Sequence, residues 1–220
     1  MLAKYAYDEV AENYDQAFTS SVSKAEDRVI FQLLTEHLKQ GSVVDLGCGT
    51  GALLEHLNIN PKDYLGLDFS SKMLYQARAK FPNYRFREQD IREINLGSFT
   101  VDNVVALWSA LSYAGADSVK EALRILKPGG AYFFMFYGKN YRKRKSYILH
   151  KFKLTVDYED ARKLLDLLPW DATVIPFNYS GDRLSWIPST RIVTRLLRLE
   201  TQLYGWSKEP YTYIAIGEKA

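Results

Sequence analysis

The sequence has little cysteine, no long apolar run and little net charge, and each shortage argues against a class of protein. Its 220 residues include one cysteine, so no internal disulfide framework can form. No apolar run is long enough to cross a bilayer and the first residues do not resemble a signal peptide, so we expect no membrane partner and a cytoplasmic location. The net charge of +3 is too small to demand nucleic acid as a partner.

The chain does have enough apolar sequence for a full core. With 47% hydrophobic residues, its length fits one domain with a lid, and no repeat or low-complexity linker divides it. Short apolar runs alternate with helical patterns, which predicts an α/β fold with a mostly parallel sheet. The sequence indicates no metal site and does not indicate an oligomeric state.

The most informative stretch runs from Val43 to Gly51. A short β-branched run reaches Asp45, glycines follow at alternate positions, and residues 52–57 have the composition of a helix. This order predicts strand, tight turn and helix, with the turn backbone and the helix N–H groups facing a nucleotide-like ligand. The glycines satisfy the dinucleotide fingerprint, but Asp45 would repel a pyrophosphate and suits a ligand with a cationic amine.

The run Asp-Leu-Gly-x-Gly-x-Gly, with Leu-Lys-Pro-Gly-Gly at residues 126–130, resembles the class I S-adenosylmethionine (SAM) methyltransferases. The resemblance implies a doubly wound, Rossmann-like sheet of seven mostly parallel strands, SAM as cofactor and methyl transfer as activity. Nicotinamide-binding domains do not usually pair these two elements, which weighs against a dehydrogenase. The resemblance is strong over residues 43–130 and extends to the rest in pattern only.

In that family the glycine turn holds the methionine and ribose parts of SAM. The resemblance therefore implies that Asp45, Gly47, Cys48 and Gly49 bind the cofactor. We interpret Cys48 as a small residue beside the ligand rather than as a nucleophile.

A second predicted strand covers residues 64–68 and ends in Asp68. This acid lies about 20 residues after the glycines, where a carboxylate can accept hydrogen bonds from both ribose hydroxyls. Its alternative role is a helix N-cap, although Ser70 can fill that position.

The adenine side of the site rests on resemblance. It implies that Phe69 and Met73 pack on the adenine ring, although either residue could equally belong to the core. A third predicted strand, residues 84–88, is followed by Asp90 and Ile91. In the family an acid at this point accepts the adenine amino group, and the neighbouring backbone contacts the ring nitrogen.

The apolar strand predicted at residues 101–107 leads into Trp108 and Tyr113. In the family this strand end faces the transferred methyl group, which makes both residues catalytic candidates and Trp108 also a cofactor contact; core packing is the alternative. The segment lacks the Asn/Asp-Pro-Pro-aromatic pattern of enzymes that methylate amino groups in nucleic acids and release factors. It looks more like enzymes acting on sugar amines and small metabolites, so we expect a small-molecule N or O nucleophile.

The first residues form an apolar helical face that includes Tyr7 and Tyr14. The face predicts a helix packed on the sheet. Many small-molecule methyltransferases open with a similar Tyr-Asp-x-x-Ala-x-x-Tyr-Asp segment that folds over the cofactor. That resemblance makes Tyr14 a candidate for both cofactor binding and catalysis.

Residues 139–153 hold seven of the 29 basic residues, interleaved with aromatics, which leaves 22 basic against 26 acidic residues elsewhere. The segment is either a solvated lid helix or a grip for a nucleic-acid backbone or an acidic substrate, and the first of these grips keeps an RNA methyltransferase as an alternative. In the resembled family, insertions at this point commonly cover the substrate. His150 within the segment is a candidate general base. A SAM-binding protein without transferase activity is a further alternative.

We expect the single domain to have four parts. An N-terminal cap spans residues 1–40, the cofactor-binding core 41–138, and the basic lid insertion 139–157. The last part, residues 158–220, shows a helix, strand, helix, strand pattern that completes the sheet.

Overall fold

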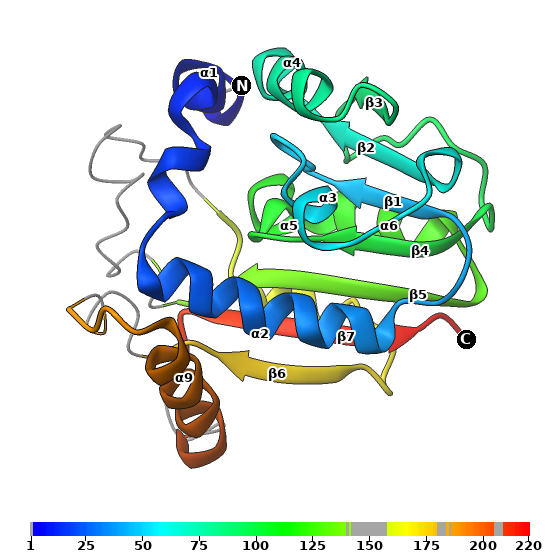
Figure 1. Cartoon of the computed structure of the whole chain (residues 1–220). Coiled ribbons are helices and arrows are strands. Elements are labelled where there is room, and N and C mark those ends of the chain that lie inside the picture. The colour runs from blue at the N-terminus through cyan, green and yellow to red at the C-terminus, as the bar shows by residue number, and fades with distance from the viewer. Residues whose placement is uncertain (1, 140, 142–157, 180–183, 185, 205–208) are drawn as a thin grey trace.

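The computed structural model describes residues 2–139, 141, 158–179, 184, 186–204 and 209–220. These residues form a sheet of seven strands between two layers of helices (Figure 1), which confirms the predicted doubly wound architecture. The helices and strands are α1 (Leu2–Val10), η1 (Ala11–Asn13), η2 (Asp15–Phe18), α2 (Ser21–His37), β1 (Val43–Leu46), α3 (Ala52–His56), η3 (Pro61–Asp63), β2 (Tyr64–Asp68), α4 (Ser71–Lys80), β3 (Arg85–Glu88), β4 (Val101–Ala106), α5 (Ala110–Ala114), α6 (Ala116–Ile125), β5 (Leu126–Tyr137), α8 (Ala161–Leu165), β6 (Thr173–Phe177), α9 (Thr190–Tyr204) and β7 (Thr212–Glu218).

The strand order across the sheet is β3-β2-β1-β4-β5-β7-β6. The first five of these strands are parallel to their neighbours, whereas β7 is antiparallel to both β5 and β6. The chain therefore leaves β1 toward one edge of the sheet and later returns through β4 on the other side of β1. In open α/β sheets this point of reversal is where a crevice forms beyond the carboxyl ends of the strands.

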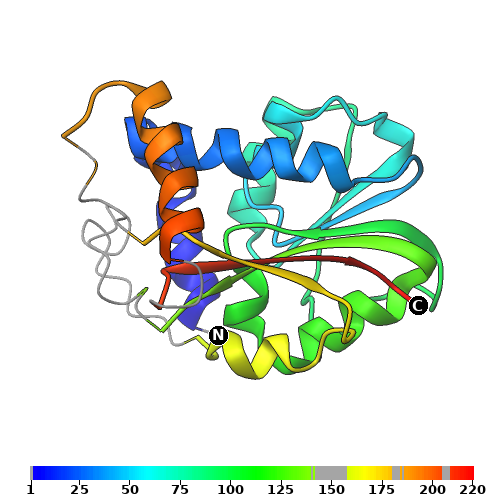
Figure 2. The same ribbon diagram turned by 90° about the horizontal axis from the view of Figure 1, so that it is seen from below.

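Two apolar cores lie on the two faces of the sheet. Helices α2 and α9 cover one face, and α5, α6 and α8 cover the other (Figure 2). Val43 belongs to the first core and its neighbour Val44 to the second, because successive strand residues point to opposite faces. Both residues are buried, which explains why the central strands are continuous apolar runs.

Several element boundaries differ from the sequence pattern. The predicted N-terminal helix is divided into α1 and two short 3-10 turns, η1 and η2. Strand β5 begins at Leu126 rather than at Ala131, because Leu126 already pairs with Val101 before the register shifts. Of the basic segment, Lys139 and Tyr141 are described, whereas His150 lies outside the described residues.

Asp102 connects the amino-terminal ends of three parallel strands, at the opposite end of the sheet from their carboxyl ends. Its carboxylate accepts hydrogen bonds from the Ser42 N–H and hydroxyl at 2.9 and 2.7 Å, and from the Lys127 ammonium at 2.7 Å. Lys127 and then Ser42 lower the pKa of Asp102 to about 2. These contacts fix the starts of β1, β4 and β5 relative to one another.

We expect Asp102→Ala to destabilise the fold by about 1–3 kcal/mol, because three donors lose their acceptor. The wild-type contribution is present above about pH 4, the ordinary aspartate pKa, and is lost as the pH falls toward 2. Urea unfolding at pH 7 measures the difference. Asp117→Ala removes an exposed carboxylate that pairs with Lys120 and should cost less than about 1 kcal/mol; equal losses would contradict the role of Asp102.

Candidate functional site

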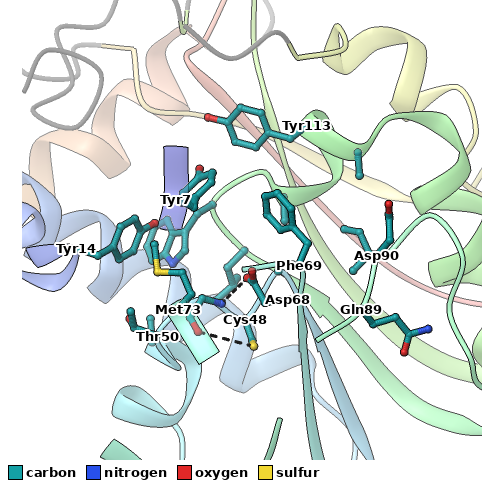
Figure 3. A pocket seen from close by; sticks show the side chains of 18 of the residues that line it. Tyr7, Tyr14, Cys48, Thr50, Asp68, Phe69, Met73, Gln89, Asp90 and Tyr113 are labelled. Carbon is teal, nitrogen blue, oxygen red and sulfur yellow. Dashed lines mark hydrogen bonds between the residues drawn. The ribbon is translucent and has the colours of Figure 1, made fainter. Parts of the chain in front are cut away.

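A cavity lies beyond the carboxyl ends of β1, β2, β3 and β4, at the point where the strand order reverses (Figure 3). Polar groups come from the glycine turn and from the ends of β2 and β3, whereas aromatic rings come from the N-terminal segment and from the end of β4. The residues that line it are Tyr7, Tyr14, Gly47, Cys48, Gly49, Thr50, Ala52, Asp68, Phe69, Met73, Gln89, Asp90, Ile91, Arg92, Leu107, Trp108, Ala110, Tyr113 and Ala114.

The glycine turn after β1 is held against β2 by backbone hydrogen bonds. The N–H groups of Gly47 and Cys48 both donate to the Leu67 carbonyl, at 2.7 and 3.0 Å. Gly47 has a φ of +70°, and a Cβ at this position would lie 2.4 Å from the Cβ of Ala110. A larger residue would therefore separate the turn from α5, which explains why the motif requires glycine here.

Asp68 is buried at the end of β2, with 5% of its surface exposed. Its carboxylate accepts from the Gly49 N–H at 2.9 Å and from the Ser70 N–H at 2.8 Å. Burial raises the pKa of Asp68 to about 6, against the opposing effect of these hydrogen bonds. Each carboxylate oxygen has a second lone pair, so the group can still accept hydrogen bonds from two ligand hydroxyls. The hydroxyl of Ser70 caps α4 by accepting from the Met73 N–H, as the sequence predicted.

Asp45 is not among the residues that line the cavity. It lies on the same face of β1 as Val43, and its carboxylate accepts a hydrogen bond from the Tyr64 hydroxyl at 2.9 Å. Burial raises the pKa of Asp45 to about 7. Direct contact of Asp45 with a cofactor stays a prediction, because its described partner is Tyr64.

The end of β3 places three polar side chains along the cavity. Both oxygens of Asp90 accept from the Arg92 Nε at 3.0 Å, and Arg92 lowers the pKa of the carboxyl. Gln89 donates to the Glu93 carbonyl at 2.9 Å, while its buried Oε1 has no hydrogen-bond partner among the described residues. This amide oxygen is therefore a buried acceptor without a partner among the described residues.

The end of β4 leaves regular strand geometry where it reaches the cavity. Trp108 and Ser109 both have positive φ, +51° and +61°, which is uncommon outside glycine. This backbone directs Trp108 both to the cavity and to the core, where its ring meets Phe31 edge-on at 6.4 Å between centroids. Trp108 therefore lines the cavity and also packs on the core, while its roles in catalysis and cofactor binding stay predictions.

The N-terminal segment crosses the cavity and is tied to the sheet by polar contacts. The Ser70 and Thr50 hydroxyls donate to Asp8 and Asp15 respectively, each at 2.6 Å. Lys4 donates to the Phe69 carbonyl and, at 2.7 Å, to Glu88. These contacts explain how residues far from the sheet in sequence supply two cavity-lining rings, Tyr7 and Tyr14.

Most of the predicted site residues meet at one place. Ten of the eleven proposed cofactor contacts line the cavity, the exception being Asp45, and so does the catalytic candidate Tyr113. Their individual roles stay predictions. The sequence analysis did not identify four further lining residues, which are Tyr7, Thr50, Gln89 and Arg92. Tyr7 could have been found because it shares a predicted helical face with Tyr14. The other three lie next to predicted site residues in the sequence.

The described residues contain neither a metal-binding cluster nor a membrane-spanning helix. No group of three or more His, Cys, Asp or Glu side chains in this part of the chain could hold a metal ion. No described helix combines the length and the apolar character needed to span a membrane.

Asp15→Ala should loosen the N-terminal segment, because Asp15 also forms an ion pair with Lys80 at 2.9 Å. We expect amide hydrogen exchange of residues 11–18 to accelerate by about tenfold, a loss of about 1.4 kcal/mol of local stability. Glu12→Ala changes an exposed acid of the same segment and is the matched control. Unchanged exchange in the Asp15 variant would show that its contacts do not hold the segment.

Comparisons with known proteins agree with this architecture. Residues 43–130 match the family model of a methyltransferase domain. The chain is 35% identical over 94 residues, 40% of its own length, to dTDP-3-amino-3,4,6-trideoxy-alpha-D-glucopyranose N,N-dimethyltransferase of Streptomyces venezuelae. Its fold is similar to a SAM-dependent methyltransferase of Thermotoga maritima described as a possible histamine N-methyltransferase, with a TM-score of 0.67, 17% identity and 99% of both chains covered. It is also similar to the [4+2]-cyclase SpnF, with a TM-score of 0.62, 17% identity and coverage of 99% of this chain and 94% of the other.

The match covers 39% of the length of the Streptomyces relative, and this chain likewise spans half or less of two further curated relatives. The two solved structures show a shared fold, since their sequences are only 17% identical to this one. The domain match falls on the segment that builds the glycine turn and the first four strand ends. Residues 43–130 therefore match a methyltransferase domain, and this match, together with the relatives and the shared fold, supports the predicted class I SAM-dependent methyltransferase family, which implies S-adenosylmethionine as cofactor.

Proposed function

We propose that this chain, acting as one domain, transfers a methyl group from SAM to a nitrogen or oxygen of a small molecule. The observation that carries the proposal is the pairing of Asp68 with the glycine turn. The Gly49 N–H binds the carboxylate of Asp68, so one rigid unit presents both a ribose acceptor and a closely approachable backbone to the cavity.

The cavity residues fit the chemical groups of SAM. Asp68 would accept the ribose hydroxyls, and the backbone of Gly47 and Gly49 would lie along the methionine part. The free Oε1 of Gln89, beside Ile91, offers an acceptor for the adenine amino group. Asp90 is the acid that the family resemblance assigns to that amino group, and here its lone pairs are shared with Arg92.

The bound cofactor supplies an electrophilic methyl group on a sulfonium, so the protein has mainly to align the acceptor and exclude water. The rings of Tyr7, Tyr14 and Tyr113 line the cavity, where they would help to exclude water. Burial raises the pKa of all three hydroxyls, so they stay protonated at neutral pH and do not act as bases. His150, proposed from the sequence as a base, lies outside the described residues.

A second candidate function is a SAM-binding protein that does not transfer methyl groups. The observation that favours it is the similarity of this fold to a structure named as a [4+2]-cyclase. The two functions differ in a simple measurement. Incubation with methyl-labelled SAM and a panel of small amines and alcohols yields labelled product in the first case and none in the second.

The cofactor assignment is tested by titrating the protein with S-adenosylhomocysteine in a calorimeter. Asp68→Ala should weaken binding by about 10- to 100-fold, because two hydrogen bonds to a charged group are lost. Asp63→Ala, at the opposite end of β2, is the matched control and should bind normally. Because Asp68 also holds the turn, circular dichroism must confirm folding, and the isosteric Asp68→Asn serves if the alanine variant unfolds. Equal affinity in folded Asp68 variants and wild type would refute the assignment.

The pH dependence of the same titration is a separate prediction. The folded protein without ligand has an Asp68 pKa of about 6, and the ribose hydroxyls donate to its ionised form. Affinity for S-adenosylhomocysteine should therefore fall below pH 6, by up to about tenfold per pH unit, and be flat between pH 7 and 8. Asp68→Asn should show no such fall between pH 6 and 5; an identical slope in this variant would assign the titration to another group.

RNA methylation is an outcome that the titration can also detect. A short RNA added to the complex with S-adenosylhomocysteine should show no binding if the acceptor is a small molecule. Binding that weakens steeply between 50 and 200 mM salt would instead support the basic segment 139–153 as a grip for RNA.

A further inference from the structure

Three tyrosine rings gather where the acceptor must approach. Tyr7 is central: its ring centroid lies 6.1 Å from those of Tyr14, Tyr113 and Phe69, at interplanar angles of 55°, 78° and 70°. All four rings line the cavity and come from three separate segments of the chain (Figure 3). We call Tyr7, Tyr14 and Tyr113 the tyrosine cluster. Rings at such angles present both edges and electron-rich faces to whatever occupies the cavity.

A second set of rings fixes the position of Tyr113. Its hydroxyl donates to the hydroxyl of Tyr137 at 3.4 Å, and the two rings meet edge-on with centroids 5.4 Å apart. Tyr137 is itself stacked on Tyr141, at 3.6 Å and 18°, and contacts Tyr158 at 5.3 Å. The ring of Tyr113 is therefore held by packing, which reduces the entropy cost of binding a ligand against it.

The charges around the cavity disfavour an anionic acceptor. Among the described residues that line it, the basic side chain is Arg92, and both oxygens of Asp90 already bind it. A carboxylate or phosphate entering next to the tyrosine cluster would meet no further cation among the described residues that line the cavity. The π faces of the rings, by contrast, attract positive charge.

We propose that the acceptor is an amine and that the tyrosine cluster stabilises, through cation–π contacts, the positive charge that forms on its nitrogen; this inference rests on the proposed function. The neutral amine attacks the methyl carbon with its lone pair, a C–N bond forms, and the C–S bond breaks with its electron pair going to sulfur. Positive charge thereby moves from the sulfonium to the nitrogen. A primary or secondary amine then releases a proton to water, and a tertiary amine leaves as a quaternary ammonium.

The identity of the cluster residues agrees with an amine rather than an alcohol. An alcohol acceptor needs a base to remove its proton, and the tyrosine hydroxyls stay protonated at neutral pH because burial raises their pKa. An amine needs only to be unprotonated when it attacks, and it can release that proton to water before it enters the cavity. The rings then face the charge that develops on nitrogen, which is the interaction that lowers the barrier.

The test compares three probes of the same shape on the complex with S-adenosylhomocysteine: choline, its uncharged isostere 3,3-dimethylbutan-1-ol, and the anion 3,3-dimethylbutanoate. Calorimetric titration should show choline binding at least about tenfold more tightly than the other two. Equal affinity for choline and the neutral alcohol, or preference for the anion, would overturn the proposal.

Substitutions at Tyr113 separate ring from hydroxyl. Tyr113→Phe keeps the π face and should retain the preference for choline, whereas Tyr113→Leu should reduce it about three- to tenfold. Tyr75→Leu, a tyrosine on α4 with 70% of its surface exposed, is the matched control and should change nothing. Equal losses in the Phe and Leu variants would assign the effect to the hydroxyl and refute the cation–π contact.

Failure of the proposed function and failure of the amine assignment give different results. If S-adenosylhomocysteine does not bind wild type, the proposed function itself is wrong. If it binds but the probes are not distinguished, the function stands and the amine assignment is wrong. Methyl-labelled SAM supplies an independent readout, because label should enter amines of a small-molecule panel and not the matching alcohols or carboxylates.

Discussion

The structure depends on the contact between the glycine turn and the end of β2. The Leu67 carbonyl accepts two N–H groups of the turn, and the next residue, Asp68, accepts a third through its side chain. The turn can come this close only because Gly47 has no Cβ to meet Ala110. One backbone arrangement thus fixes the glycine turn at the cavity and the orientation of the Asp68 carboxylate.

Burying carboxylates in this region makes the free energy of folding less favourable. Asp45 and Asp68 are 2% and 5% exposed, and burial raises their pKa values to about 7 and about 6. The folded protein therefore keeps protons between about pH 4 and pH 7 that the unfolded chain releases, so these groups make folding less favourable as the pH rises through that range. A ligand whose hydroxyls donate to Asp68 compensates part of this cost, which links cofactor binding to stability.

The sequence could predict the parts that depend on local pattern. The strand runs, the glycine turn, the Ser70 cap and the acid at the end of β2 follow from periodicity and from residues within a few positions of one another. Asp45 shows where prediction from local pattern stops. Its position before the turn indicated the ligand, but alternation along β1 puts its side chain on the face of Val43, where a hydroxyl from β2 reaches it. That partner is known only once β1 and β2 are in register.

The rest could not be predicted because it depends on long-range packing. Tyr7 meets Tyr113 only because polar contacts at Asp8 and Asp15 bring the N-terminal segment over the sheet. The left-handed backbone at Trp108 and Ser109 could not be predicted because neither residue is glycine. Packing against Phe31 holds the Trp108 ring in place. The unpartnered Oε1 of Gln89 likewise appears only in the folded structure, where Nε2 of the same amide donates to the Glu93 carbonyl.

The cavity is consequently divided between two kinds of chemistry. The ends of β1, β2 and β3 supply hydrogen-bonding groups with fixed geometry, which suits a ligand that is the same in every turnover. The N-terminal segment and α5 supply rings, whose attraction to positive charge depends little on the exact shape of the ligand. If the tyrosine cluster binds the acceptor, as proposed, substitution of Tyr113 should alter which acceptor binds without disturbing Asp68 or the glycine turn, because the hydrogen bonds of Asp68 do not involve Tyr113. Under that proposal, cofactor recognition and the choice of acceptor at Tyr113 are physically separable.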